Sequence, residues 1–129
     1  MENFFEQPIS RVKLLETSSL VLAFVGDAVH TLFVRNKIVH DQNLAVGMQH
    51  KNAIELCCAK SQANKLDIIS SFLYQDEDDV VRRARNVKSK SKPKHAQAED
   101  YSKATAYEAL IGWLWLSGNH DRMFELLKY

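Results

Sequence analysis

Apolar side chains recur along this chain at intervals of three and four residues, and this spacing is the feature that most restricts its fold. The apolar–polar alternation of a half-buried strand is absent, and only four glycines and two prolines interrupt the sequence. The chain is therefore predicted to be all-α, with about six to seven helices in a single compact domain. Its 129 residues suit one domain, residues 1–129, that buries a core without disulfide bonds.

The N-terminal half is expected to hold two long helical regions. The first begins after Thr17-Ser18-Ser19, whose hydroxyl groups suit a helix N-cap, and extends to about Val39. Its apolar positions are too widely spread for one surface stripe, which predicts burial on more than one side. The second region is expected from about residue 44 to residue 73, with one break near residues 64–67.

The C-terminal half is expected to hold three more helices. Four acidic residues, 76–79, suit the positive N-terminal end of a short helix. Residues 88–98 carry a proline and little apolar surface, which predicts an exposed loop. A long helix is expected over residues 99–116, ending before Gly118, with a short closing helix around Met123. Four aromatic residues at helical spacing are predicted to lie in the core: Trp113, Trp115, Phe124 and Tyr129.

The cysteines and the N-terminus indicate a cytoplasmic protein. Cys57 and Cys58 are neighbours and cannot form a disulfide framework, which favours reduced thiols and a reducing compartment. The N-terminal residues lack the features of a secretion signal. The longest apolar run, residues 20–25, is too short to cross a membrane. No two histidines have the spacing of a zinc site on a helix, so zinc is not expected.

Gly26 and Asp27 lie in the middle of the most apolar predicted helix. A glycine inside a helix costs about 1 kcal/mol relative to alanine. A buried, unpaired carboxylate costs several kcal/mol more. Both costs are explained if the glycine admits a close neighbour and a cation compensates the acid. The alternatives are an acid on a solvated helix face or one paired with a buried arginine.

Glu108 repeats this pattern in the last long helix, where small residues and Gly112 surround it. Two such helices could pack with both carboxylates, Asp27 and Glu108, facing one cavity. Oxygen ligands that leave room for water suit magnesium, which binds proteins through few carboxylates. A magnesium ion held there would activate water for attack on a phosphodiester. The spacing alone leaves open whether the two acids meet.

One segment is strongly basic although the net charge is only +1. Between residues 82 and 95 seven cations occur without an acid: Arg82, Arg83, Arg85, Lys88, Lys90, Lys92 and Lys94. Such a segment suits the phosphate backbone of RNA, and it equally suits a solvated surface loop. Asn86 and Ser89 are expected to make further polar contacts or to fix the loop.

Three of these motifs resemble a known family. The run from Leu22 to Val29 is similar to the signature helix of ribonuclease III, and the run from Thr105 to Gly112 is similar to its second acidic motif. Residues 81–89 with Pro93-Lys94 resemble the Mini-ribonuclease III subgroup, which is the catalytic domain without a separate double-stranded-RNA-binding domain.

The resemblance implies a magnesium-dependent endoribonuclease that cuts double-stranded RNA as a homodimer and leaves 5′-phosphate and 3′-hydroxyl ends. Asp27 and Glu108 match the carboxylates that bind the metal and perform catalysis, and the basic segment with Asn86 is then expected to bind RNA. Ala23 and Thr105 stand where larger family members carry further acids, so water or a partner-subunit group would complete the metal shell. His30 replaces an aromatic tyrosine of the subgroup and is expected at the dimer contact or near the site, without a catalytic role.

The subgroup also implies a role in ribosomal RNA maturation, with precursor ribosomal RNA as substrate and a ribosomal protein as a candidate partner. Two other functions are considered. One is a non-catalytic double-stranded-RNA-binding or ribosome-associated module with the same fold, although retention of both acids weighs against it. The other is a helical protein-interaction module whose acids are surface residues.

Overall fold

The computed structural model describes residues 4–41, 45–87 and 95–129, and they form helices without a strand. The predicted all-α class is confirmed. Seven α-helices follow in chain order, with a 3₁₀ turn, η1, at Ser70–Phe72. The helices are α1 (Arg11–Glu16), α2 (Ser19–Asp41), α3 (Val46–Cys57), α4 (Ala59–Ile69), α5 (Gln75–Arg85), α6 (His95–Leu116) and α7 (His120–Leu127).

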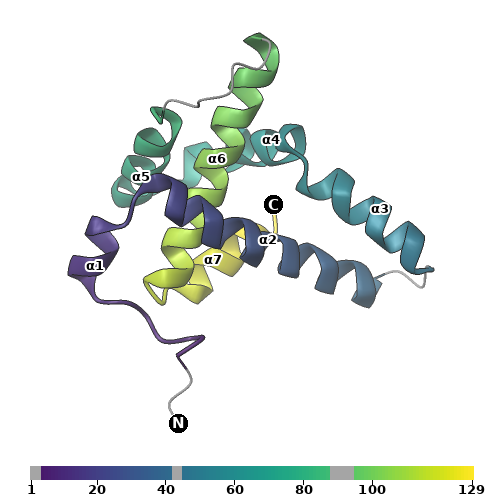
Figure 1. The fold of residues 1–129 in the computed structure, drawn as a ribbon, viewed down its shortest axis with the longest axis horizontal. Coiled ribbons are helices and arrows are strands. Elements are labelled where there is room, and N and C mark those ends of the chain that lie inside the picture. The colour runs from purple at the N-terminus through teal and green to yellow at the C-terminus, as the bar shows by residue number, and fades with distance from the viewer. Residues whose placement is uncertain (1–3, 42–44, 88–94) are drawn as a thin grey trace.

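Helix α6 is the centre of the domain. Figure 1 shows α2 running across it, with α4, α5 and α7 arranged around it. Four large side chains of α6 are completely buried: Tyr107, Leu110, Ile111 and Leu114. Helix α3 instead packs on the C-terminal half of α2, where Ala53 contacts Val34 and Ile38 in a smaller cluster. Helices α2, α4, α5 and α7 therefore pack against α6, and α3 packs against α2.

The predicted start of α2 is confirmed. The hydroxyl of Ser18 accepts a hydrogen bond from the backbone N–H of Val21 at 3.2 Å, which caps the helix. The helix extends to Asp41, two residues beyond the predicted end.

The predicted break in the second helical region was wrong in position. Residues 64–67 lie inside α4, and the chain bends at Cys58, whose backbone is extended with φ −71° and ψ 159°. The bend lets α3 follow α2 while α4 turns its buried face, which includes Leu66 and Ile69, toward α6. No glycine or proline stands at this bend, so the local sequence carries no signal for it.

The boundaries near the C-terminus also differ from the prediction. Helix α6 begins at His95, so residues 95–98 are helical, while residues 88–94 lie outside the described residues. Gly118 has φ +77°, a left-handed conformation that suits glycine and ends α6 as predicted. Helix α7 begins at His120, three residues before Met123.

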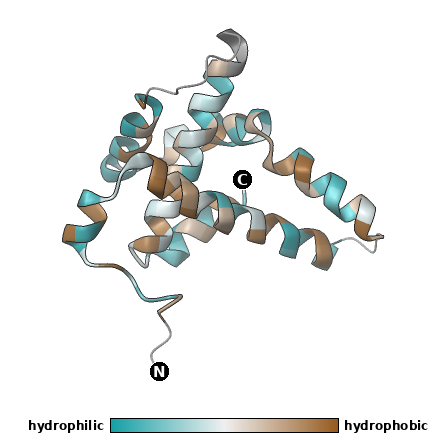
Figure 2. Cartoon of the chain, in the orientation of Figure 1, coloured by the Kyte–Doolittle hydropathy of each residue, from teal (hydrophilic) through white to brown (hydrophobic). Residues whose placement is uncertain are grey.

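Two predictions about burial were wrong. Helix α2 is not buried on several sides, because Phe24 is 79% exposed and Leu20 is 58% exposed. Figure 2 shows this helix as a largely apolar ribbon. Of the aromatic residues predicted to be core, Trp113 and Trp115 are half-buried, but Phe124 and Tyr129 are exposed.

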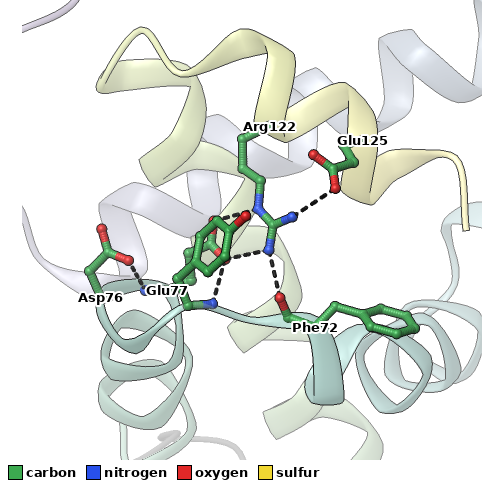
Figure 3. Close-up of polar contacts among 6 residues, drawn as sticks. Phe72, Asp76, Glu77, Arg122 and Glu125 are labelled. Carbon is green, nitrogen blue, oxygen red and sulfur yellow. Dashed lines mark hydrogen bonds and ion pairs between the residues drawn. The ribbon is translucent and has the colours of Figure 1, made fainter.

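Glu77 is buried, unlike its acidic neighbours at the start of α5. Its two carboxylate oxygens accept hydrogen bonds from Nε and Nη2 of Arg122, at 2.9 and 2.8 Å (Figure 3). The guanidinium also donates to the carbonyl oxygen of Phe72 at 2.7 Å and to Glu125 at 3.1 Å, and it lies over the ring of Tyr74. This network ties α7 to η1 and α5, and the sequence patterns did not predict it.

Within the described ranges no helix is long and apolar enough to span a bilayer.

Candidate active site

Helices α2 and α6 touch backbone to backbone at two glycines. A methyl group at Gly26 would overlap the carbonyl oxygen of Glu108, and one at Gly112 would overlap that of Leu22. The expectation that Gly26 admits a close neighbour is therefore confirmed. The contact brings together the two segments that carry the predicted acids.

This contact leads to a prediction for stability. Replacing Gly26 by alanine should force α2 and α6 apart and lower the free energy of unfolding by about 1–3 kcal/mol, as overpacking usually does. Gly47 on α3 faces open space, and a methyl group added there would meet no atom within 4 Å. Gly47→Ala is thus a matched control that should gain up to about 1 kcal/mol. Urea unfolding of both variants measures the difference, and equal stabilities would contradict the tight crossing.

The carboxyl groups of Asp27 and Glu108 lie within hydrogen-bonding contact of each other. Asp27 is exposed and Glu108 is half-buried, so the pair opens to solvent on the Asp27 side. Asp27 is thus a solvated acid, and the expected cost of burial falls on Glu108 instead.

Proximity and burial change the acidity of this pair. Burial, the negative charge of Asp27 and the hydrogen bond between the carboxyl groups raise the pKa of Glu108 from 4.5 to about 8. Glu108 therefore retains its proton at neutral pH. A cation bound by both carboxyl groups would displace this proton and compensate the negative charges of the two acids.

The raised pKa of Glu108 predicts how stability depends on pH. The folded protein retains a proton that the unfolded chain releases, so stability is present below pH 4.5 and is lost as pH rises toward 8. Without divalent metal, the free energy of unfolding should fall by about 1–2 kcal/mol between pH 6.5 and 8, since one pKa unit corresponds to 1.4 kcal/mol. Urea unfolding in EDTA measures it. Glu108→Gln should abolish the slope, and a slope that persists in this variant would contradict the assignment.

The carboxylate pair has few additional ligands in its own chain. Over the described part of the chain, no group of three or more His, Cys, Asp or Glu side chains is placed to hold a metal ion. Ala23 is buried and Thr105 is half-buried, and neither supplies a carboxylate. The chain thus offers two carboxylates for a cation.

His30 is completely buried among α2, α4 and α6, which rules out the alternative that it forms a dimer contact. Its ring meets that of Tyr107, the neighbour of Glu108, edge to face at 5.3 Å. Its two nitrogens lie 3.3 Å from Nε2 of Gln62 and 3.4 Å from Nζ of Lys65. The hydroxyl of Tyr107 is buried and has no hydrogen-bond partner among the described residues.

The polar residues around His30 were not predicted from the sequence. One signal was present, because Gln62 and Lys65 stand on the same side of α4 as Leu66 and Ile69, where apolar residues are expected. Polar residues at such positions indicate a buried polar contact.

The predicted RNA-binding residues that the structure describes lie at the end of α5. Arg82, Arg83, Arg85 and Asn86 are all exposed or partly exposed. Arg82 forms an ion pair with Asp79 at 2.7 Å. Lys88, Lys90, Lys92 and Lys94, together with Ser89, lie outside the described residues.

A groove of about 430 Å³ separates the end of α5 from α4 and α6. Its lining includes two acids, Asp67 and Asp78, together with Arg82, Arg85 and Asn86 from the end of α5 and Ser102 of α6. Glu108 is six residues further along the same helix, which is about 9 Å at 1.5 Å per residue. The basic end of α5 and the carboxylate pair are therefore about two turns apart along α6.

Comparison with known proteins agrees with these features. Residues 20–119 match the Ribonuclease III domain family. The chain is 41% identical over 120 residues to the Mini-ribonuclease 3 of Thermoanaerobacter sp. (strain X514), covering 93% of this chain and 84% of that protein. It is 43% identical over 112 residues to the Mini-ribonuclease 3 of Brevibacillus brevis, covering 87% and 84%. A crystal structure of a protein from Fusobacterium nucleatum has a TM-score of 0.79 at 26% identity, covering 88% of this chain and 90% of that one.

Proposed function

Because the chain belongs to the ribonuclease III family, and within it to the Mini-ribonuclease III group, we propose that residues 1–129 form one catalytic domain whose carboxylates are Asp27 and Glu108. The protein is an endoribonuclease that acts on double-stranded RNA. The observation that carries the site assignment is the contact between these two acids at the crossing of α2 and α6.

The family depends on a divalent metal ion, and we infer that this chain uses magnesium. The donor set fits, because two carboxylates, one of them exposed, leave room for the waters that magnesium retains. When bound there, magnesium would activate a water molecule and stabilise the leaving oxygen of the phosphodiester. Asp27 and Glu108 would hold the ion, and the proton on Glu108 would be released.

No neighbouring side chain that the structure describes is suited to act as a general base. His30 is buried, both of its nitrogens have polar partners, and burial together with Lys65 lowers its pKa to about 4. At pH 7 the imidazole of His30 is therefore uncharged, and both of its nitrogens are occupied by polar contacts. The role of the chain is to position the cation and the RNA rather than to remove a proton with a dedicated base.

Arginine and lysine side chains after Val81 are proposed to hold the RNA backbone. Arg82, Arg83, Arg85 and Asn86 are accessible at the end of α5, beside the groove that Ser102 of α6 also lines. We propose the same role for Lys88, Lys90, Lys92 and Lys94. Arginine suits paired contacts to phosphate oxygens, and lysine acts as a point charge.

The family is typically dimeric, and the exposed apolar face of α2 supports a homodimer for this chain. Three apolar side chains of this face, Leu20, Phe24 and Leu32, are each more than half exposed. Monomeric proteins rarely expose a large apolar surface, because its contact with water is unfavourable. Two copies of the face would bury each other. Such a dimer would present one carboxylate pair to each strand of a duplex.

The dimer can be tested with Phe24→Glu, which places a charge at the most exposed apolar side chain of α2. The variant should elute as a monomer in gel filtration with light scattering at about 10 μM, because burying an unpaired carboxylate costs several kcal/mol. Ile68→Glu is a matched control, since Ile68 is an exposed apolar residue on α4. A wild-type monomer, or a Phe24→Glu dimer, would contradict this interface.

The substrate in the cell is proposed to be precursor ribosomal RNA in the cytoplasm, with a ribosomal protein as a candidate partner. The test is incubation of a long RNA duplex with the protein and magnesium, with EDTA and single-stranded RNA as controls. We expect cleavage of the duplex with magnesium, leaving 5′-phosphate and 3′-hydroxyl ends. Salt-sensitive binding without cleavage under any divalent metal would favour a non-catalytic RNA-binding module. Absence of RNA binding would favour a protein-interaction module.

A further inference from the structure

Lys65 of α4 is a half-buried cation with no acidic partner in the part of the chain that the structure describes. Its ammonium lies 3.4 Å from Nε2 of His30. Among the described residues no carboxylate forms an ion pair with it, whereas Lys103 and Arg122 each pair with two acids. A lysine held in a partly buried place without an anion is unusual, because burial disfavours its charge.

His30 holds the ammonium as a neutral acceptor. An ammonium group can only donate, so Nε2 of His30 accepts and the ring proton resides on Nδ1. That nitrogen faces the side-chain amide of Gln62 at 3.3 Å, whose oxygen can accept the proton if the amide is rotated. Since the imidazole is completely buried and uncharged, it fixes the position of Lys65 without balancing its charge.

A second cation, Lys37, lies near Lys65. Burial lowers the pKa of Lys65, and the nearby charge of Lys37 lowers it further. The contact with His30 occupies one of the three ammonium hydrogens, so the group can still donate to a second acceptor. The surroundings would therefore favour an anion that accepts hydrogen bonds.

Lys65 contacts the helical turn that follows Asp27, because its ammonium meets His30, three residues after the acid. Asp27, His30 and Thr31 share one face of α2, at spacings of three and four residues. Thr31 forms a hydrogen bond with the sulfur of Cys57, and the acidity of that thiol responds to the charges of both Asp27 and Lys65. Cys57 is thus within range of the charges of both Asp27 and Lys65.

We propose that Lys65, held by His30 and Gln62, binds a phosphate group of the RNA backbone next to the Asp27–Glu108 pair and so positions the strand that is cut. The inference rests on the proposed function, which places a phosphodiester at that pair. The lysine contacts RNA from the α2–α4 side, whereas the basic end of α5 contacts it from the other side of α6. A bound phosphate supplies the ion-pair partner that Lys65 lacks among the described residues.

The test compares Lys65→Gln with the wild-type protein in cleavage and in binding. We expect KM for a duplex RNA to rise about tenfold with little change in kcat, because one charged hydrogen bond to substrate is lost. Binding is measured in the Glu108→Gln background, where cleavage is removed, by titration at several salt concentrations. Loss of one phosphate contact should make the slope of log K against log salt shallower by about one.

Three further measurements make the outcome decisive. Lys65→Arg should restore the salt slope because it keeps the charge, and Lys128→Gln, which removes an exposed lysine on the C-terminal side of α7, should leave KM and slope unchanged. Lys65→Gln should be as stable as the wild-type protein in urea unfolding.

An unchanged KM and salt slope, or a loss of stability that explains both changes, would overturn the proposal and leave Lys65 a structural residue. Failure of the wild-type protein to cut duplex RNA would instead count against the proposed function.

Discussion

Replacing Arg122 by methionine is expected to lower the free energy of unfolding by about 3–5 kcal/mol, because it leaves the buried carboxylate of Glu77 without its cation. Glu77 is 1% exposed and Arg122 is 7% exposed, so water cannot replace the lost partner. The change also removes the hydrogen bond to the carbonyl oxygen of Phe72 (Figure 3) and the contact with the Tyr74 ring. Thermal and urea unfolding measure the loss.

A double variant tests whether the loss of stability comes from leaving the carboxylate of Glu77 buried without Arg122. Arg122→Met combined with Glu77→Leu should recover at least about half of that loss, because two apolar side chains leave no uncompensated charge. Glu125→Gln is the control for the exposed arm of the network and should change stability by less than about 0.5 kcal/mol. If Arg122→Met alone is as stable as the wild-type protein, the network does not hold α7 against α5.

Replacing either carboxylate of the pair is expected to remove activity while leaving the fold intact. Asp27→Asn and Glu108→Gln keep the size of each side chain but remove a metal ligand, and each should lower the rate of duplex RNA cleavage by about a thousandfold or more, equivalent to at least about 4 kcal/mol of transition-state stabilisation. Glu108→Gln should also stabilise the metal-free protein above pH 7, because the raised pKa of Glu108 opposes its ionisation there. Cleavage rates and urea unfolding of the same preparations test both statements.

Glu99→Gln is the matched control for these variants. Glu99 lies on α6, two and a half turns before Glu108, and forms one exposed ion pair, with Lys103 at 3.6 Å. Its replacement should leave cleavage within about twofold of the wild-type rate, as expected for a surface ion pair. Cleavage that survives in Glu108→Gln, or is equally lost in Glu99→Gln, would show that the site lies elsewhere.

The features predictable from the sequence are those that local patterns determine. Apolar spacing indicated helices, the hydroxyl of Ser18 indicated where α2 begins, and Gly118 indicated where α6 ends. The glycine near each acid, Gly26 beside Asp27 and Gly112 one turn after Glu108, indicated a close approach of helices, and the structure shows that each glycine meets the backbone of the other helix.

The features that the sequence did not reveal depend on contacts between distant residues. The bend at Cys58 follows from packing against two different helices, because α3 contacts α2 and α4 contacts α6. Glu77 stands among three exposed or half-exposed acids, and nothing in that run distinguishes the one that pairs with Arg122, 45 residues away. Hydropathy of single residues likewise could not show that Phe24 is exposed, since an apolar side chain suits a core and an interface equally.

The central claim is that Asp27 and Glu108 form one cation site, and a titration of the RNA-free protein with magnesium near pH 7 tests it most directly. With Glu108 holding a proton in the free protein, because its pKa is about 8, magnesium binding should release close to one proton per site into a weak buffer. Glu108→Gln should release none and bind magnesium more weakly. Equal affinity and equal proton release from the wild-type protein and Glu108→Gln would contradict the claim.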